Sequence, residues 1–355
     1  MAAATAPVAR RRAAPRGRWL LRLLVVGIAG LRPAAPARMS RRGLLGGAAG
    51  AAGAAVGLGL SPPGAAAAST QCREKASLAQ RLDATVLSPL GPSLNPLAPQ
   101  ELYYPEWVFG QWSITATLAR KQFPFGEDKV PKSLVEGSPR NRKEAVGDST
   151  TYEIRYFSTL ADTPRNNAVT QLGLGMPKSE IILDRAFSAA SLNKAYDQLA
   201  KVSNVEWDYS KDPTRLTVNF APSTTADMQP IGPRRVEAYI TARAAEPYTD
   251  CAGGGEGFLF TEKSRSVTLQ PRSVVVTDLE NIVDYRRVSD GVIEGRSRTA
   301  YFLSPNPNSR EGVLWQEVGG KAVAIFDYDI RMERMIDAKV GRPCVDTPKG
   351  YTQCY

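Results

Sequence analysis

A glycine and two tryptophans at the start of an alternating segment constrain the fold of this chain more than any other feature. Residues 103–112 read Tyr-Tyr-Pro-Glu-Trp-Val-Phe-Gly-Gln-Trp, and from Trp112 to Leu118 apolar and polar side chains alternate. Such alternation predicts a half-buried β-strand. Gly110 lets the backbone approach other structure closely as the strand begins. Trp112 is then expected to be the first large side chain on the buried face.

Further strand patterns follow, and helices are few. Segments 257–260 and 264–269 fit either two short strands or one bent strand, and 273–277 adds another short one. Because strands far outnumber helices, at the short spacing of sandwiches and barrels, we predict an all-β antiparallel fold of about nine strands with one or two helices. Besides residues 112–120, the clearest strand patterns lie at 150–157, 205–209, 215–220, 235–241, 282–288, 292–303, 312–318 and 321–332.

One segment has the pattern of a longer helix. Residues 184–202 place apolar side chains at helical spacing, and a second, shorter helix is predicted within 69–87. The stripe expected to face the core of the longer helix is Phe187, Ala190, Leu192, Ala195, Tyr196 and Leu199.

The positive charge of the chain belongs to its first 68 residues. The sequence carries 45 Lys and Arg against 35 Asp and Glu, a formal charge of +10. Ten of these basic residues are arginines within 1–68, which contains no acidic residue, so 35 basic residues balance 35 acidic ones in the remainder. A neutral body without a basic cluster predicts no nucleic-acid binding.

The sequence contains no histidine. Ser-His-Asp and Cys-His catalysis and histidine metal ligands are therefore excluded. The four cysteines include no Cys-x-x-Cys pair, so a four-cysteine zinc site is not expected. We accordingly predict no metal, no cofactor and no enzymatic activity.

The first 68 residues resemble a two-part targeting leader. Residues 1–38 are rich in Ala, Arg and Pro, as in a chloroplast transit peptide, and 39–68 contain Ser-Arg-Arg-Gly-Leu-Leu, a weakly apolar run and an Ala-x-Ala end. This order is similar to twin-arginine targeting to the thylakoid lumen. We expect a mature lumenal chain without a transmembrane segment, made of a helix and Pro-rich linker (69–99), a β domain (100–336) and a cysteine-containing tail (337–355).

Delivery to the lumen permits disulfides. One arrangement joins Cys344 to Cys354 in a small loop and leaves Cys72 for Cys251. Four cysteines allow three pairings, and the sequence does not choose among them.

A Gly-x-Trp that enters the first strand of an antiparallel domain resembles the calycins, the lipocalin-like barrels. The resemblance implies that Trp112 closes one barrel end and that a basic residue of the last strand packs across it. In the last predicted strand Arg334 shares the apolar face with Phe326 and Met332, so Arg334 is the expected partner. We therefore assign barrel closure to Gly110, Trp112 and Arg334.

The mature chain as a whole also resembles an uncharacterised family of lumenal proteins from plastids and cyanobacteria, through its Tyr-Pro-Glu-Trp-x-x-Gly-x-Trp opening. That family implies no particular reaction. The roughly 220 residues between Trp112 and Arg334 exceed an ordinary lipocalin barrel, so insertions are expected, with long loops at 123–147 and 160–178.

The leading functional hypothesis is non-catalytic binding of a hydrophobic small molecule, such as a lipid, pigment or quinone-like compound, inside the barrel. An alternative is a structural or assembly factor that docks on a photosynthetic membrane complex. A third hypothesis, an isomerase or epoxidase-type enzyme, would need acid–base groups such as Glu153, Glu206 or Asp208. Asp327 and Asp329 are interpreted as a solvated strand face. The candidate ligand contacts are Trp107, Tyr152, Tyr156 and Tyr328.

Overall fold

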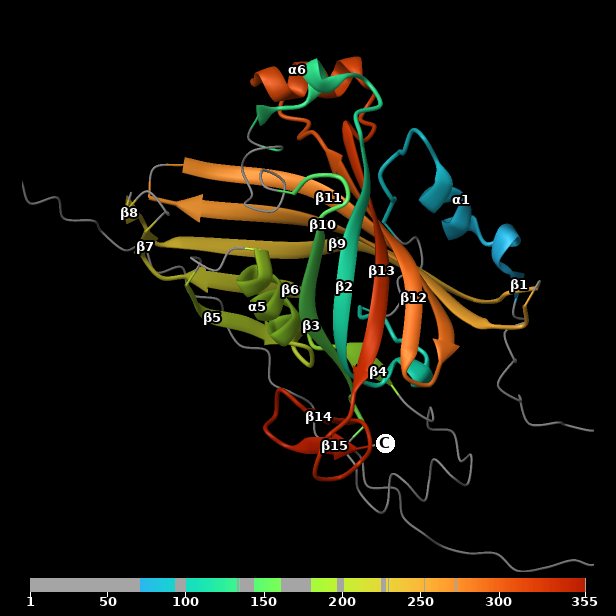
Figure 1. Ribbon diagram of the computed structural model, residues 1–355. Helices are drawn as coiled ribbons and strands as arrows, with labels where there is room; N and C mark the ends of the chain where they lie inside the picture. Colours follow the sequence, from blue (N-terminus) through green and yellow to red (C-terminus); the bar gives the residue numbers. More distant parts are fainter. Residues whose placement is uncertain are drawn as a thin grey trace, which may run out of the picture. The chain divides into compact units, whose positions relative to one another are not determined.

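One large, mostly antiparallel β-sheet dominates the structure (Figure 1). The computed structural model describes residues 71–92, 100–132, 134, 144–160, 180–196, 201–224, 228, 230–251, 253–271 and 273–354. The expected leader (1–68), most of the Pro-rich linker (93–99) and most of the predicted loop at 160–178 lie outside the described residues.

The sheet contains eleven strands and confirms the all-β antiparallel class. Its strands follow the order β4 (Ile181–Leu183), β3 (Ser149–Ser158), β2 (Gly110–Gln122), β13 (Ala324–Met335), β12 (Val292–Phe302), β11 (Ser273–Ser289), β10 (Glu256–Gln270), β9 (Arg234–Thr249), β6 (Asp212–Phe220) and β5 (Val202–Asp208). A short β1 (Gln71–Cys72) pairs in parallel with β9.

The sheet curls into a half-barrel (Figure 1). β4 and β5 stand at opposite ends of the strand order, and no pairing joins them among the residues that the structure describes. The closed nine-strand barrel expected from the sequence is therefore not observed. Smaller elements are the hairpins β7 (Ser223–Thr224) with β8 (Pro230–Ile231) and β14 (Cys344–Asp346) with β15 (Thr352–Cys354), and the 3-10 turns η1 (Arg73–Lys75), η2 (Glu106–Val108) and η3 (Glu127–Lys129).

Each face of the sheet carries a buried core, and strand parity separates the two cores. Phe258 and Phe260 of β10 belong to the core on the concave face, whereas Leu259 between them belongs to a second core on the convex face. Since neighbouring residues of a strand point to opposite faces, each cluster lies on one side. The concave core includes the alternating residues of β2, among them Trp112 and Leu118, both 0% exposed.

Helix α1 (Ser77–Asp83) covers the convex face. Its Leu78, Ala79 and Leu82 pack with a layer of sheet residues, which confirms the short helix predicted within 69–87. Figure 1 shows α1 and the longer helix α5 (Arg185–Tyr196) on opposite sides of the sheet. The sheet residues that contact α1 include Tyr248, Leu259, Ile282, Ala300, Phe302 and Ile325.

Buried ion pairs lie beneath α1. Arg298, fully buried, donates from Nε to Asp327 Oδ1 at 2.7 Å and from Nη1 to the carbonyl of Ala84. Arg81 of α1 holds the buried carboxylate of Glu280, Nη2 to Oε1 at 2.7 Å. The predicted solvated face is thus wrong for Asp327, which is 6% exposed, although Asp329 is exposed. The reason is tertiary, because α1 and Arg298 supply cover and counter-charge.

Residues 312–318, predicted as a strand, instead form most of helix α6 (Arg310–Glu317) and its C-cap, Val318. Ser309 is its N-cap, and the Ser309 side chain accepts from the Gly312 N–H at 3.1 Å, a typical helix start. A Cβ at position 312 would lie 1.8 Å from the carbonyl oxygen of Asn306. The Gly319-Gly320 pair, both with positive φ, ends the helix instead of turning a hairpin. A short apolar run does not by itself distinguish helix from strand.

Two of the ambiguous strand patterns are also resolved. Residues 257–260 and 264–269 belong to one strand, β10, whose register shifts between Lys263 and Ser264. Such a bulge bends a strand without ending it. Residues 273–277 and 282–288 likewise form the single strand β11.

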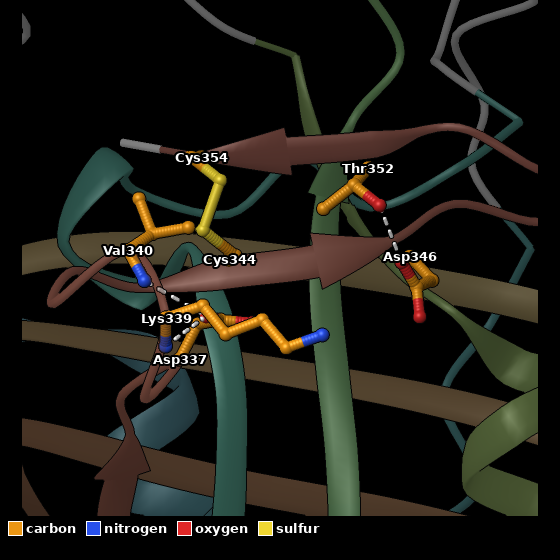
Figure 2. The surroundings of a disulfide bond; sticks show 7 residues. All are labelled: Asp337, Lys339, Val340, Cys344, Asp346, Thr352 and Cys354. Atoms are coloured by element: carbon orange, nitrogen blue, oxygen red, sulfur yellow. Dashed lines mark hydrogen bonds between the residues drawn. A yellow bond between two sulfur atoms is a disulfide. The ribbon is translucent and has the colours of Figure 1, made fainter.

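The cysteines form two disulfides, Cys72–Cys251 and Cys344–Cys354. The first ties β1 to the segment just after β9, and the second closes the β14–β15 hairpin, as Figure 2 shows. Gln353 of β15 exchanges two 2.9 Å hydrogen bonds with the Ser158 backbone of β3. The C-terminal hairpin is thereby fixed to β3, the strand next to the edge strand β4.

Candidate functional site

Helix α5 covers the open side of the half-barrel. It packs against β3 near one end of the strand order and against β5 and β6 at the other. On the β3 side, Arg155 donates from Nε to Asp184 Oδ2 at 2.8 Å, and its guanidinium lies 4.1 Å from the centre of the Phe187 ring. Ser191 Oγ accepts the backbone N–H of Glu153 at 2.9 Å. The predicted helix is confirmed over Arg185–Tyr196, and it bridges strands that do not pair.

A cavity of about 350 Å³ lies between α5 and the concave face of the sheet. One face of α5 lines it through Arg185, Ser188, Ala189 and Leu192, spaced at three, four and seven residues, as expected for a single helical face. This face shares only Leu192 with the predicted stripe. The apolar part of the sheet wall comprises Ile114, Ile154, Leu183, Leu216, Ala238, Ile240, Phe260 and Val283.

Four tyrosines line the cavity, and three of them are deeply buried: Tyr104, Tyr156 and Tyr285. The Tyr104 and Tyr156 rings lie 4.8 Å apart between centroids, and the Tyr156 and Tyr285 hydroxyl oxygens lie 3.1 Å apart. Each of the three residues is at most 5% exposed. Burial raises the pKa of each phenol well above 10, since the ionised form loses its hydration. All three therefore stay protonated across physiological pH.

The charged side chains at the cavity form ion pairs with one another. Arg185 binds Glu262 with Nη1 to Oε2 at 2.8 Å and Nη2 to Oε1 at 2.7 Å, and it also donates to Glu101. Arg243 lies against both carboxylates. Burial opposes the charge of Glu262, but its pKa is lowered overall because the charge and hydrogen bonds of Arg185 outweigh that effect. Two cations thus balance two anions.

The structure brings only part of the predicted ligand set together. Tyr152 and Tyr156 line the cavity. Tyr328 does not, because its hydroxyl donates to Glu144 Oε2 at 2.8 Å within the core, and Trp107 lines a separate groove beside Arg287. Sequence reasoning missed Tyr104, Arg185, Ser188, Glu262 and Tyr285. The alternation of one predicted strand could have identified Tyr285, because Tyr285 lies on the same face of that strand as Val283.

The Trp112 region has the geometry that strand parity predicted. Arg334 Cζ lies 4.6 Å from the centre of the Trp112 ring, and Arg334 donates from Nη2 to the carbonyl of Trp107. The indole Nε1–H of Trp112 donates to the carbonyl of Val108 at 2.7 Å. Gly110 has a φ of +123°, a conformation that favours glycine. Trp112 does not line the cavity.

The carboxylates proposed for acid–base chemistry lie elsewhere. Glu153 accepts from Gln111 Nε2 at 2.8 Å, and its neighbour Ile154 rather than Glu153 faces the cavity. Glu206 and Asp208 are exposed on β5. Hydrogen bonds from Ser210 lower the pKa of Asp208 to about 2. Among the residues placed by the structure, no cluster of three metal-ligating side chains occurs, and no helix is long and apolar enough to cross a membrane.

The fold and cavity define a half-barrel protein in which a helix covers the open side of the sheet. A sequence model of one family, described as a domain of unknown function (DUF6816), matches residues 96–336. The match covers more than half of the chain, and the protein belongs to this family. Neither a search of curated proteins nor a search of solved structures found a match.

Proposed function

We propose that the protein binds a hydrophobic small molecule in the cavity beneath α5, without catalysing a reaction. The observation that carries the proposal is the cavity itself, which is walled by aliphatic and aromatic side chains with a few polar groups. Its volume falls at the lower end of the roughly 300–1,000 Å³ typical of ligand pockets. In this proposal the half-barrel and α5 together do what a closed barrel does in lipocalin-like proteins.

One cavity-lining carboxylate, Glu262, bears on the catalytic alternative. A general base works best with a pKa near the operating pH, whereas Arg185 lowers the pKa of Glu262 and occupies both of its oxygens. The carboxylate is thus held as half of an ion pair. This arrangement favours binding over proton transfer.

The proposed location is the thylakoid lumen. Two disulfides join all four cysteines, and structural disulfides persist in oxidising compartments. The leader-like composition of residues 1–68 supplies the plastid part of the proposal.

Native mass spectrometry of the protein purified from its own membranes tests the function. We expect a bound small molecule that is lost in Ala189→Trp, because the indole would fill the cavity, and retained in Lys194→Trp, on the exposed side of α5. A ligand-free wild type, with one dominant membrane-complex subunit cross-linked to it in thylakoids, would instead support an assembly factor.

A further inference from the structure

We infer that the cavity selects neutral ligands that accept hydrogen bonds, such as apolar ketones or quinones, through phenolic hydrogens that the protein leaves unused. The inference rests on the proposed function and specifies the ligand chemistry of the same cavity. Its basis is the hydrogen bonding of four side-chain hydroxyls on the cavity wall, those of Tyr104, Tyr156, Tyr285 and Ser188.

The three phenols carry three O–H donors. Tyr156 and Tyr285 share a single hydrogen bond, so whichever hydroxyl accepts it keeps its own hydrogen. The Tyr104 hydroxyl makes no hydrogen bond to any described residue, although Tyr104 is only 5% exposed. At least two phenolic hydrogens therefore lack a protein acceptor at the cavity wall.

On the opposite wall, the hydroxyl of Ser188 also lacks a hydrogen-bond partner. Ser188 Oγ of α5 lines the cavity, is shielded from solvent and has no hydrogen-bond partner in the described part of the chain. Buried polar groups almost always have partners. Unused donors on both the sheet and the helix therefore indicate that an acceptor on a bound molecule completes the site.

The charged side chains at and beside the cavity wall balance one another and so disfavour a charged ligand. The Arg185 and Arg243 guanidiniums are balanced by the Glu101 and Glu262 carboxylates, so no net charge is left for a counter-ion. An anionic or cationic ligand would lose its hydration without gaining a partner. A phenol that stays protonated donates to a carbonyl oxygen, which is acceptor-only, without any change of charge.

Two small molecules of nearly equal shape test the inference. Fluorenone and fluorene differ by one carbonyl, and acetophenone and α-methylstyrene form a smaller pair with the same difference. We expect calorimetry to show that each ketone binds about tenfold more tightly than its hydrocarbon, which is the order of one net hydrogen bond. Infrared difference spectra should show the carbonyl stretch of bound ketone shifted to lower frequency.

Phenol-to-phenyl variants separate the possible results. Tyr104→Phe should lower the ketone preference, and the triple variant Tyr104→Phe/Tyr156→Phe/Tyr285→Phe should lower it further and diminish the carbonyl shift, while hydrocarbon affinity is retained. Tyr248→Phe is the matched control, because its buried hydroxyl bonds Asp284 on the convex side.

Failure of the inference and failure of the proposed function give different results. Equal affinity for ketone and hydrocarbon in the wild type, or a preference unchanged in both cavity variants, would overturn the inference and leave hydrophobic binding intact. If none of the four molecules binds, the proposed function fails with it. Circular dichroism of each variant establishes that the fold is retained.

Discussion

The two faces of the sheet are each covered in part by a helix, and the two helices contribute different side chains. α1 presents Leu78 and Leu82 to a convex layer that includes Leu259 and Phe302, and these side chains fill the interface. α5 presents Ser188 and other small or paired side chains to the concave face, and a cavity remains. Both interfaces bury ion pairs at their margins, so charge does not distinguish them. The difference lies in the volume of the side chains that the helix contributes.

The hydrogen bonds of the buried polar side chains also differ between the two faces. On the convex side, Arg298 is occupied by Asp327 and a backbone carbonyl, and Tyr248 by Asp284. On the concave side, the side-chain hydroxyls of Tyr104 and Ser188 have no hydrogen-bond partner among the described residues. Complete satisfaction is expected of a structural interface, and unused donors are expected of a binding site.

The largest effect should come from the convex ion pair. Arg298→Ala would leave Asp327 buried beside only the half-exposed Arg120. Breaking one side of a buried pair costs about 3–5 kcal/mol, and we expect a loss near the lower end in urea unfolding. Arg331→Ala, which removes an exposed guanidinium from the same face of β13, should cost less than about 0.5 kcal/mol. Equal losses of stability would contradict the claim that the buried ion pair stabilises this face more than an exposed one does.

Leu82→Ala tests whether α1 is a purely structural cover. Leu82 is 1% exposed, and removing such a side chain costs about 2–4 kcal/mol. We expect a lower urea midpoint with unchanged affinity for a cavity ligand. A parallel fall in ligand affinity, measured by calorimetry on folded protein, would show that the two faces are coupled.

The concave ion pair should give the smaller, pH-dependent effect. The folded-state pKa of Glu262 is lowered, so its stabilisation is fully present above the unfolded value of about 4.3 and is lost as pH falls through the folded pKa. Urea unfolding from pH 6 to pH 3 should show a steeper loss for the wild type than for Glu262→Gln. Identical slopes would mean that other carboxylates dominate acid unfolding.

Arg334→Met should have the smallest effect on stability. The substitution keeps an unbranched stem beside Gly110 and removes the guanidinium over Trp112. A partly desolvated cation–π contact contributes about 0.5–2 kcal/mol, and we expect a loss of about 1 kcal/mol in urea unfolding. Ligand affinity should not change, because neither Arg334 nor Trp112 lines the cavity.

Much of the strand architecture could be predicted because its information is local. Alternation placed Trp112 and Arg334 on the same face, and the structure pairs these two residues directly in the β2–β13 ladder. The same reasoning failed for residues 312–318, where a helix and a strand bury similar apolar runs. It also failed for Asp327, because the sequence of a strand does not show whether another segment covers its polar side chains.

The candidate site was predictable only in part. Tyr152 and Tyr156 lie on a strand whose alternation shows which side chains face inward, and both line the cavity. Trp107 was chosen by residue type and lines a groove. Tyr328 has the inward parity that its strand predicts, but its hydroxyl bonds Glu144 within the core. Arg185 and Ser188 belong to a helix whose cavity face does not carry the most apolar residues.

The sequence by itself determined the all-β class and the alternation of faces, because these depend on a period of two residues. The contact between the first and last predicted strands was implied by the calycin resemblance, and parity selected Arg334 for it. Only the tertiary structure decided the disulfide pairing, the curl that remains open between β4 and β5, and the placement of α5 across it. It also decided the charge balance of the cavity, since Arg185 meets Glu101 and Glu262 from 84 and 77 residues away. Periodicity assigns a side chain to a face, whereas packing between distant segments determines whether that face is filled.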